Sequence, residues 1–382
     1  MIRALGVLIL LSTLLWALSL SVGAEEVEQV GESVPDTFFD FLDALPQDVL
    51  ELLPSSLFSS NAEDVGNAAE EMSSFPFLLR AVVFCVRESL SGCFEALITV
   101  VGLLLLSAVF SSCRSAFTSP SIAKAFAWAS SLAILVAIVR AGYLSLSSVT
   151  DYFTRLNQLT AGAIPLLGTL YAMGGNVTAA ATSSAGLSVY LVLLEEIVGN
   201  SILPFCGVCL ALSFLSSPQF GVRAGSLLGT VKKQYTTLLA FLMMLLLAMI
   251  ATQTTLASKA DTLAMRSVKF AAGNLIPVVG GSVSELIRTV GAGIGYLRGV
   301  IGICGVLLLI LFLLPTFVRL LLYRLVWQIG ASLADLLGCD GEKRLLDEIA
   351  SLCGYLLAAV SICSSVLLLS LTLLAHCALA IG

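Results

Sequence analysis

Long apolar stretches separated by short polar connections run through the chain from residue 93 to its end. An amphipathic stretch at 75–92 precedes them and predicts a helix at the membrane interface. The stretches that are long enough to cross a membrane lie at residues 94–112, 125–147, 178–215, 237–257, 299–318 and 353–376. A backbone in lipid must satisfy its own hydrogen bonds, which favours helices. The pattern therefore predicts an all-α, polytopic helical membrane protein, with about six transmembrane helices in residues 93–382.

The third stretch and the distribution of basic residues keep the number of crossings open. Residues 178–215 are too long for one straight crossing and contain Pro204, so they form one kinked crossing or a helix and a half-helix. Lys and Arg are enriched in cytoplasmic connections. With six crossings, however, one connection outside the cytoplasm carries five of them: Lys259, Arg266, Lys269, Arg288 and Arg298. Seven crossings are therefore the alternative topology.

Residues 1–24 have the pattern of a secretory signal peptide. Arg3 supplies the positive end, an apolar run follows, and the small residues Val22-Gly23-Ala24 precede a cleavage position before Glu25. An uncleaved first membrane span is the alternative, although the run is short for a crossing. Either arrangement places residues 25–74 outside the cytoplasm.

The segment at 25–74 is acidic. Up to Glu71 it has 13 Asp and Glu residues and no Lys or Arg. Apolar clusters at 38–42 and 49–53 predict one or two short helices that lie on the membrane or on a partner. Residues 55–74 are rich in Ser, Asn and Glu, which is typical of a linker.

One Ile-Pro phrase occurs twice in the chain. Residues 161–168 read Ala-Gly-Ala-Ile-Pro-Leu-Leu-Gly, and residues 272–280 read Ala-Gly-Asn-Leu-Ile-Pro-Val-Val-Gly. Because proline and glycine break or kink helices, the phrases indicate two Pro/Gly-broken elements in a weak internal repeat. The repeats cover about 125–235 and 237–350, and a final span at 353–376 follows. The alternative is that Pro and Gly only punctuate membrane helices, which tolerate them.

These two elements contain the first group of candidate site residues. They are Pro165 and Gly168 in the first element and Gly273, Asn274, Pro277 and Gly280 in the second. Free backbone groups at membrane depth are tolerated only where protein or a water-filled cavity covers them. We therefore expect the two elements to meet at a shared cavity or to dock an assembly partner. Separate local kinks are the alternative.

The composition agrees with a membrane protein and excludes some function classes. Of 382 residues, 58% are hydrophobic and 12% are charged, whereas soluble domains have about 25% charged residues. Mean hydropathy is +1.02. The net charge of -6 comes from the acidic segment, and no basic cluster suitable for nucleic acid follows it.

No catalytic, cofactor-binding or metal-binding constellation is recognisable. The single histidine, His376, lies near the end of an apolar stretch and has no partner in sequence for acid–base chemistry. Cys206 and Cys209 have redox spacing, but they lie in an apolar stretch and have no second cysteine pair nearby. Cysteine in a membrane helix usually packs as a small apolar residue. The sequence therefore predicts a protein that is not an enzyme.

Two further groups are candidates for a pathway or for helix packing. Glu195 and Glu196 interrupt an apolar run, and carboxylates at membrane depth usually face a cavity or a partner. They could equally mark the boundary between two half-helices. Gly291, Gly295 and Gly299 recur every four residues and predict close helix packing. The pattern does not distinguish a partner helix in the same chain from one in a second copy.

The order of these parts resembles the stage III sporulation protein AE family. The most specific residues are the pairs Lys269-Phe270, Gly273-Asn274 and Ile276-Pro277, and Ile164-Pro165-Leu166-Leu167 also fits. The resemblance covers most of residues 94–376, whereas the acidic segment is similar only in character.

The resemblance implies a function that the composition does not. The family belongs to a set of stage III sporulation proteins made in the mother cell, which forms a channel-like complex with stage II sporulation protein Q from the forespore. This chain would be the permease-like membrane component, in the mother-cell-derived outer forespore membrane, with its N-terminal segment outside the cytoplasm. A stand-alone secondary transporter coupled through Glu195 or Glu196 is the alternative function.

Overall fold

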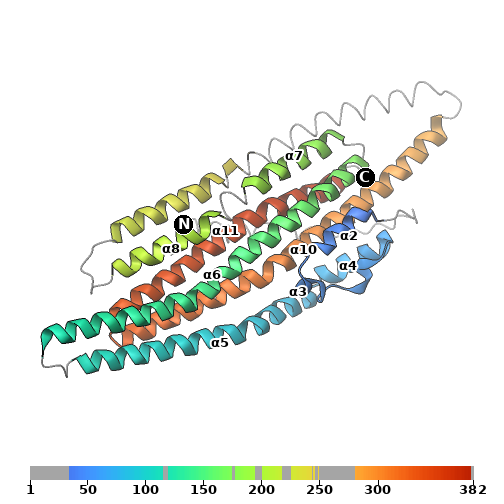
Figure 1. Ribbon diagram of the computed structural model, residues 1–382. Helices are drawn as coiled ribbons and strands as arrows, with labels where there is room; N and C mark the ends of the chain where they lie inside the picture. The colour runs from blue at the N-terminus through green and yellow to red at the C-terminus, as the bar shows by residue number, and fades with distance from the viewer. Residues whose placement is uncertain are drawn as a thin grey trace.

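The computed structural model describes residues 34–114, 119–173, 177–193, 200–216, 225–242, 244–245, 248 and 280–379. This part of the chain is helical and contains no β-strand. Four long helices form the body of the molecule (Figure 1). They are α5 (Phe75–Arg114), α6 (Pro120–Met173), α10 (Gly280–Leu336) and α11 (Asp340–Leu379). Two shorter helices, α7 (Val177–Leu193) and α8 (Asn200–Leu215), and a helical segment at 225–242 lie alongside them.

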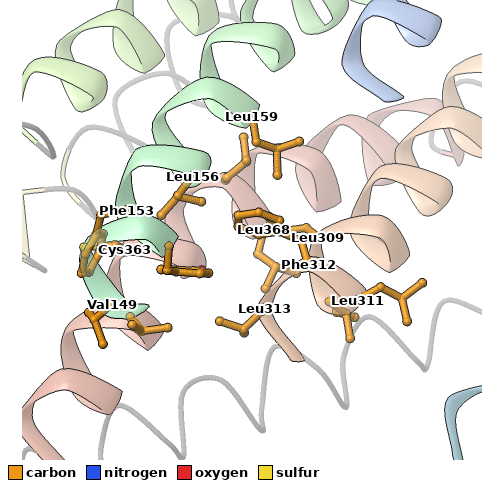
Figure 2. Packing of buried hydrophobic residues seen from close by; sticks show 14 of the residues in the cluster. Val149, Phe153, Leu156, Leu159, Leu309, Leu311, Phe312, Leu313, Cys363 and Leu368 are labelled. Atoms are coloured by element: carbon orange, nitrogen blue, oxygen red, sulfur yellow. The ribbon is translucent and has the colours of Figure 1, made fainter. Parts of the chain in front are cut away.

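The central helix of the bundle is α11. It packs along α10 and also against α6 and α8. Most of the apolar side chains that the structure describes between Leu345 and Leu371 are buried, because a helix that is apolar all round is stable only when it is enclosed. Figure 2 shows one layer of this core, where Leu156 of α6, Phe312 of α10 and Leu368 of α11 meet.

A glycine turn joins α10 to α11. Gly338 has a φ of +69°, a conformation that side chains with a Cβ rarely adopt. The amide of Gly338 donates to the carbonyl of Asp335 at 3.1 Å, and the amide of Cys339 donates to the carbonyl of Ala334 at 2.8 Å. These two bonds form a Schellman motif, which ends α10 and reverses the chain.

Among the described residues, three helices are long and apolar enough to cross a membrane. In the described residues they cover Phe75–Phe110, Gly295–Leu336 and Asp340–Leu369, and α8 is a shorter apolar helix. The all-α class and the membrane character predicted from the sequence are confirmed. The number of crossings stays a prediction. Residues 75–92 continue directly into the predicted first crossing, because α5 is one unbroken helix of 40 residues.

The first Ile-Pro element does not interrupt its helix. The structure differs here from the predicted break, since α6 runs for 54 residues with Pro165 inside it. Pro165 is exposed, while Leu166, Leu167 and Leu170 are fully buried. Packing of these side chains holds the turns on both sides of the proline, so the lost backbone hydrogen bond does not end the helix. The second element, apart from Gly280 at the start of α10, lies outside the described residues.

Residues 34–73 fold into a small helical unit, which we call the N-terminal module. It comprises α2 (Asp36–Asp43), α3 (Gln47–Leu50), the 3-10 helix η1 (Ser55–Phe58) and α4 (Ala62–Ser73). Residues 62–73 are therefore a helix and not part of a linker. Val65, Ala68, Ala69 and Met72 explain this difference, since their spacing buries one face of α4.

Candidate functional site

The N-terminal module is fixed to one end of the long bundle, and we call the contact surface the seat. Figure 1 shows α2 and α4 beside α10 at this end. The apolar side chains of Phe38, Phe41 and Leu42 from α2, and of Val65 and Met72 from α4, are at most 1% exposed. Burial this complete means that the module is held by a continuous apolar contact, with the driving force proportional to the area removed from water.

On α6, the seat coincides with the first Ile-Pro element. A Cβ on Gly162 would lie 3.7 Å from the Cα of Phe41, so the backbones of α2 and α6 approach closely. The hydroxyl groups of Thr37 and Thr169 are 3.1 Å apart and form a hydrogen bond between the same two helices. The glycine is thus used for close approach of another helix, and not for a chain reversal.

The far end of the same element contacts α7. A Cβ on Gly168 would lie 3.3 Å from Oγ of Ser184, which is tighter than most contacts of this kind. Gly162 and Gly168 therefore let α6 pack between α2 and α7. Pro165, between them, is exposed and contributes to neither contact.

On α10, the seat lies in the glycine-rich stretch. A Cβ on Gly66 of α4 would lie 2.8 Å from the hydroxyl of Tyr296, and Cys304 Sγ donates to the carbonyl of Val65 at 3.6 Å. Gly299 is buried and Gly295 is half-buried in this stretch, and Gly291 lies one turn earlier in α10. The N-terminal module thus contacts the first Ile-Pro element on α6 and, on α10, Tyr296 and Cys304, which lie within or just after the glycine-rich stretch.

The outward face of the module is acidic. Eight of its carboxylate side chains are exposed: Asp36, Asp40, Asp43, Asp48, Glu51, Glu63, Glu70 and Glu71. The sequence from 25 to 71 contains no Lys or Arg, so no cation of the module itself neutralises this face. A surface of one sign attracts partners of the opposite charge and repels partners of the same charge.

A second polar region lies where α10 turns into α11, and we call it the charged junction. It is formed by Glu342, Lys343, Arg344 and Glu348 on the first turns of α11, each with a partner on a different segment. Glu348 Oε2 accepts from Lys232 Nζ at 2.6 Å, and Glu342 Oε1 accepts from Ser107 of α5 at 2.8 Å. Lys343 Nζ donates to Asp335 of α10 at 2.6 Å.

Arg344 completes the junction at the end of α8. Its Nη1 donates to the carbonyl of Ser216 at 2.9 Å. The last carbonyl groups of a helix have no partner within the helix, and a cation placed there also interacts favourably with the helix dipole. One short stretch of α11 therefore ties together α5, α8, α10 and the helix at 225–242.

Sequence analysis did not identify the charged junction. The only local signal is a run of charged residues at the start of an apolar helix, which is also typical of a solvated helix end. Lys232 and Glu348 are 116 positions apart, and nothing near Lys232 indicates its partner.

An aromatic cluster lies between α8 and α11. The rings of Phe205 and Tyr235 are stacked with centroids 3.8 Å apart, and Tyr355 meets Phe205 edge-on at 5.8 Å. Cys206 and Cys209 are buried in the same region. Among the residues that the structure describes, no three His, Cys, Asp or Glu side chains are grouped so that they could hold a metal ion.

The remaining sequence candidates are not placed by the structure. Glu195, Glu196, Gly273, Asn274 and Pro277 lie outside the described residues. The predicted meeting of the two Ile-Pro elements at a shared cavity therefore stays a prediction. What the structure adds is that the first element has a partner of its own, the N-terminal module.

Comparison with known proteins identifies the family. A family model described as Stage III sporulation protein AE matches residues 62–378, from α4 to the end of α11. The chain belongs to the stage III sporulation protein AE family. The curated Stage III sporulation protein AE of Bacillus subtilis (strain 168) is 23% identical over 356 residues, which cover 92% of this chain and 89% of the relative. No solved structure matches the chain.

The family match confirms the resemblance predicted from the sequence. The protein is a membrane protein of the stage III sporulation set. The match includes both the long bundle and α4, the helix of the module that packs on α10. The family is a family of sporulation proteins and is not a known enzyme family.

Proposed function

We propose that this chain is a non-enzymatic membrane component of a sporulation channel or secretion-like complex that links mother cell and forespore after engulfment. The observation that carries the proposal is the family match over residues 62–378, which includes the bundle and, of the N-terminal module, the helix α4. The channel role is what membership of this family implies, and the architecture is compatible with it.

In this proposal the module is the part that meets the other components. The bundle lies in the outer forespore membrane. Cleavage after Ala24 leaves the module outside the cytoplasm, where it faces the space between the two membranes. Its exposed carboxylates then form a rigidly held acidic face, since α2 and α4 are fixed to α6 and α10. Partners are other proteins of the stage III sporulation A set and, through the complex, stage II sporulation protein Q.

The second candidate is a stand-alone secondary transporter coupled through Glu195 or Glu196. Its support is the cost of placing carboxylates at membrane depth, which makes such residues functional candidates by default. The two candidates differ in what they require. A complex component depends on its partners and on the module face, whereas a self-sufficient transporter depends on its coupling carboxylates.

Deletion of the gene in the organism that encodes it tests the proposal. We expect engulfment to finish and heat-resistant spores to be lost, and a copy of the intact gene to restore them. The double variant Glu195→Gln/Glu196→Gln should restore spores if the chain is a complex component. Full spore yield without the gene would overturn the sporulation role, and failure of the double variant at normal protein levels would favour the transporter.

The role of the acidic face has its own test. A variant with Asp36→Asn, Asp40→Asn, Glu70→Gln and Glu71→Gln removes four charges without touching the seat, since all four side chains are exposed. Purification from crosslinked sporulating cells should recover other stage III proteins with the natural chain and less of them with this variant. Equal recovery would contradict a partner surface on this face.

A further inference from the structure

The outer face of α5 exposes large apolar side chains along most of its length. Phe75, Val83 and Val109 are 75%, 57% and 56% exposed, and α5 is one of the candidate membrane spans. Phe75 and Val109 are 34 residues apart in one unbroken helix, which corresponds to about 51 Å along the helix axis. In Figure 1, α5 runs along one edge of the molecule, from the N-terminal module to the opposite end.

Lipid alone does not cover a helix face of this length. The hydrocarbon core of a bilayer is about 30 Å thick, and a helix tilted by about 40° passes through only about 39 Å of it. One end of the exposed face therefore lies beyond the hydrocarbon, and the charges indicate which end. Residues 96–113 contain no charged side chain, whereas the first half of α5 exposes four of them: Arg80, Arg87, Glu88 and Glu95.

The first half of α5 carries an apolar stripe with the spacing of a coiled coil, which we call the α5 seam. Its residues are separated by four, three and four positions and therefore share one helix face: Leu79, Val83, Val86 and Leu90. Val86 is half-buried, and the other three are 37–57% exposed. An exposed apolar stripe outside lipid marks a contact with another protein, and this spacing is that of a contact with another helix.

Two arginines border the α5 seam. Arg80 and Arg87 each directly follow a seam residue and are seven positions apart, which is a flanking position of the heptad. Neither has an Asp or Glu three or four positions away, and neither forms an ion pair in the part of the chain that the structure describes. Glu88 and Glu95 lie about 80–100° farther round the helix, away from the seam. The border of the seam is therefore positively charged and uncompensated.

We propose that the α5 seam binds an amphipathic helix of another protein, whose apolar stripe is bordered by Asp and Glu. This inference rests on the proposed function, because it names the kind of partner that the complex would supply. Carboxylates at the flanking positions of that helix would pair with Arg80 and Arg87, and such pairs decide which helices associate.

Among the described helices, a second copy of this chain does not offer such a surface. A second α5 has no carboxylate at the border of its own seam, so it would leave the arginines unpaired or set them against one another. The N-terminal module of a second copy has exposed carboxylates, but most of its apolar side chains are buried in the seat.

Photocrosslinking in sporulating cells tests the inference in the full-length protein. A photoreactive amino acid replaces Val83 in one variant and Val109 in another, a matched pair because these two valines of α5 are 57% and 56% exposed. Each variant is expressed beside the natural gene, so that the contact is tested in cells that still have the intact protein. Mass spectrometry then maps the crosslinked peptides.

The Val83 variant should crosslink to a segment of another protein whose apolar residues recur every three and four positions, with Asp or Glu beside them. The Val109 variant should crosslink to lipid. Adding Arg80→Glu and Arg87→Glu should reduce the protein adduct at Val83 roughly tenfold or more, because like charges would then face one another. Arg80→Lys with Arg87→Lys keeps the charges and should retain most of the adduct.

The inference would be overturned if Val83 crosslinked only to lipid, to a second copy, to a segment without carboxylates, or to nothing. It would equally be overturned by a protein adduct that the charge reversal leaves unchanged. None of these results bears on the sporulation role, which deletion of the gene decides separately.

Discussion

The seat and the charged junction hold the two ends of the same bundle by different kinds of contact. The seat consists of buried apolar side chains and two close approaches at Gly66 and Gly162, with one hydroxyl hydrogen bond. The charged junction consists of ion pairs and charge-assisted hydrogen bonds that radiate from one stretch of α11. The seat thus depends on shape, whereas the junction depends on charge.

This difference determines how each end responds to substitution. An apolar contact loses stability in proportion to the volume removed, and the surroundings relax only in part. An ion pair loses most when one partner is removed and the other stays buried without compensation, and little when both are replaced by apolar groups. The two ends can therefore be distinguished by single and paired substitutions.

The largest effect is expected at the centre of the seat. Phe41→Ala should destabilise docking of the module by about 3–5 kcal/mol, because Phe41 is fully buried and its removal leaves a cavity. Limited proteolysis of the detergent-purified protein should then cleave residues 34–73 much faster. Phe58→Ala is the control, since Phe58 is 48% exposed, and it should leave the cleavage rate nearly unchanged. Equal protection of both variants would contradict the seat.

The next effect is expected at the charged junction. Lys232→Met should destabilise the bundle by about 3 kcal/mol, the lower end for a buried pair, because the Lys232 side chain is 19% exposed and that of Glu348 is 7% exposed. The paired variant Lys232→Met/Glu348→Leu should recover much of the loss. Denaturant unfolding in detergent measures both. A paired variant as unstable as the single variant would show that the charges themselves are needed.

The helical class of the protein could be predicted from sequence because it depends on composition and periodicity alone. Apolar stretches of membrane length allow few structures other than helices. Residues 62–73 are an exception, since their Ser, Asn and Glu content predicts a linker whereas they form the helix α4. The helical spacing of the buried residues Val65, Ala68, Ala69 and Met72 is the signal that indicates the helix. A polar composition is compatible with a linker and with a surface helix, whereas the spacing of the apolar residues shows which helix face is buried.

The contacts of the seat and of the charged junction join segments that are distant in sequence, and they could not be predicted from local motifs. The Ile-Pro phrase predicted a broken element at residues 161–168, but α6 continues through it, and the phrase did not reveal that α2 is the neighbour of Gly162. The pair of Lys232 and Glu348 was not predictable, since neither residue carries a local sign of the other. Contacts between distant segments are decided by how the helices stack, and that information is spread over the whole core.

A close helix approach should respond more weakly than either end. A Cβ on Gly330 of α10 would lie 2.8 Å from Cγ1 of Val100 on α5, so Gly330→Leu should cost about 1–3 kcal/mol by overpacking. Gly102→Leu, on α5, is the matched control, because a Cβ there would meet nothing within 4 Å. Unfolding in detergent compares them. Equal stability of the two variants would mean that α5 and α10 are farther apart than the structure has them.

The smallest effect concerns the hydroxyl hydrogen bond of the seat, between Thr37 and Thr169. Thr169 Oγ1 donates its proton to the carbonyl of Leu166 at 2.9 Å, so Thr37 must be the donor in the hydroxyl pair. Thr37→Val keeps the shape of the side chain and removes that donor, which should weaken docking of the module by about 1 kcal/mol. Thr37→Ser keeps the donor and should be closer to the natural protein.

Proteolysis of residues 34–73 under native conditions measures this small difference, because cleavage follows the population of the undocked module when docking is fast. The order of protection should be the natural chain, then Thr37→Ser, then Thr37→Val, with Phe41→Ala far behind. If Thr37→Val cleaved as fast as Phe41→Ala, the seat would depend on a polar contact as the charged junction does. The contrast between the two ends of the bundle would then be wrong.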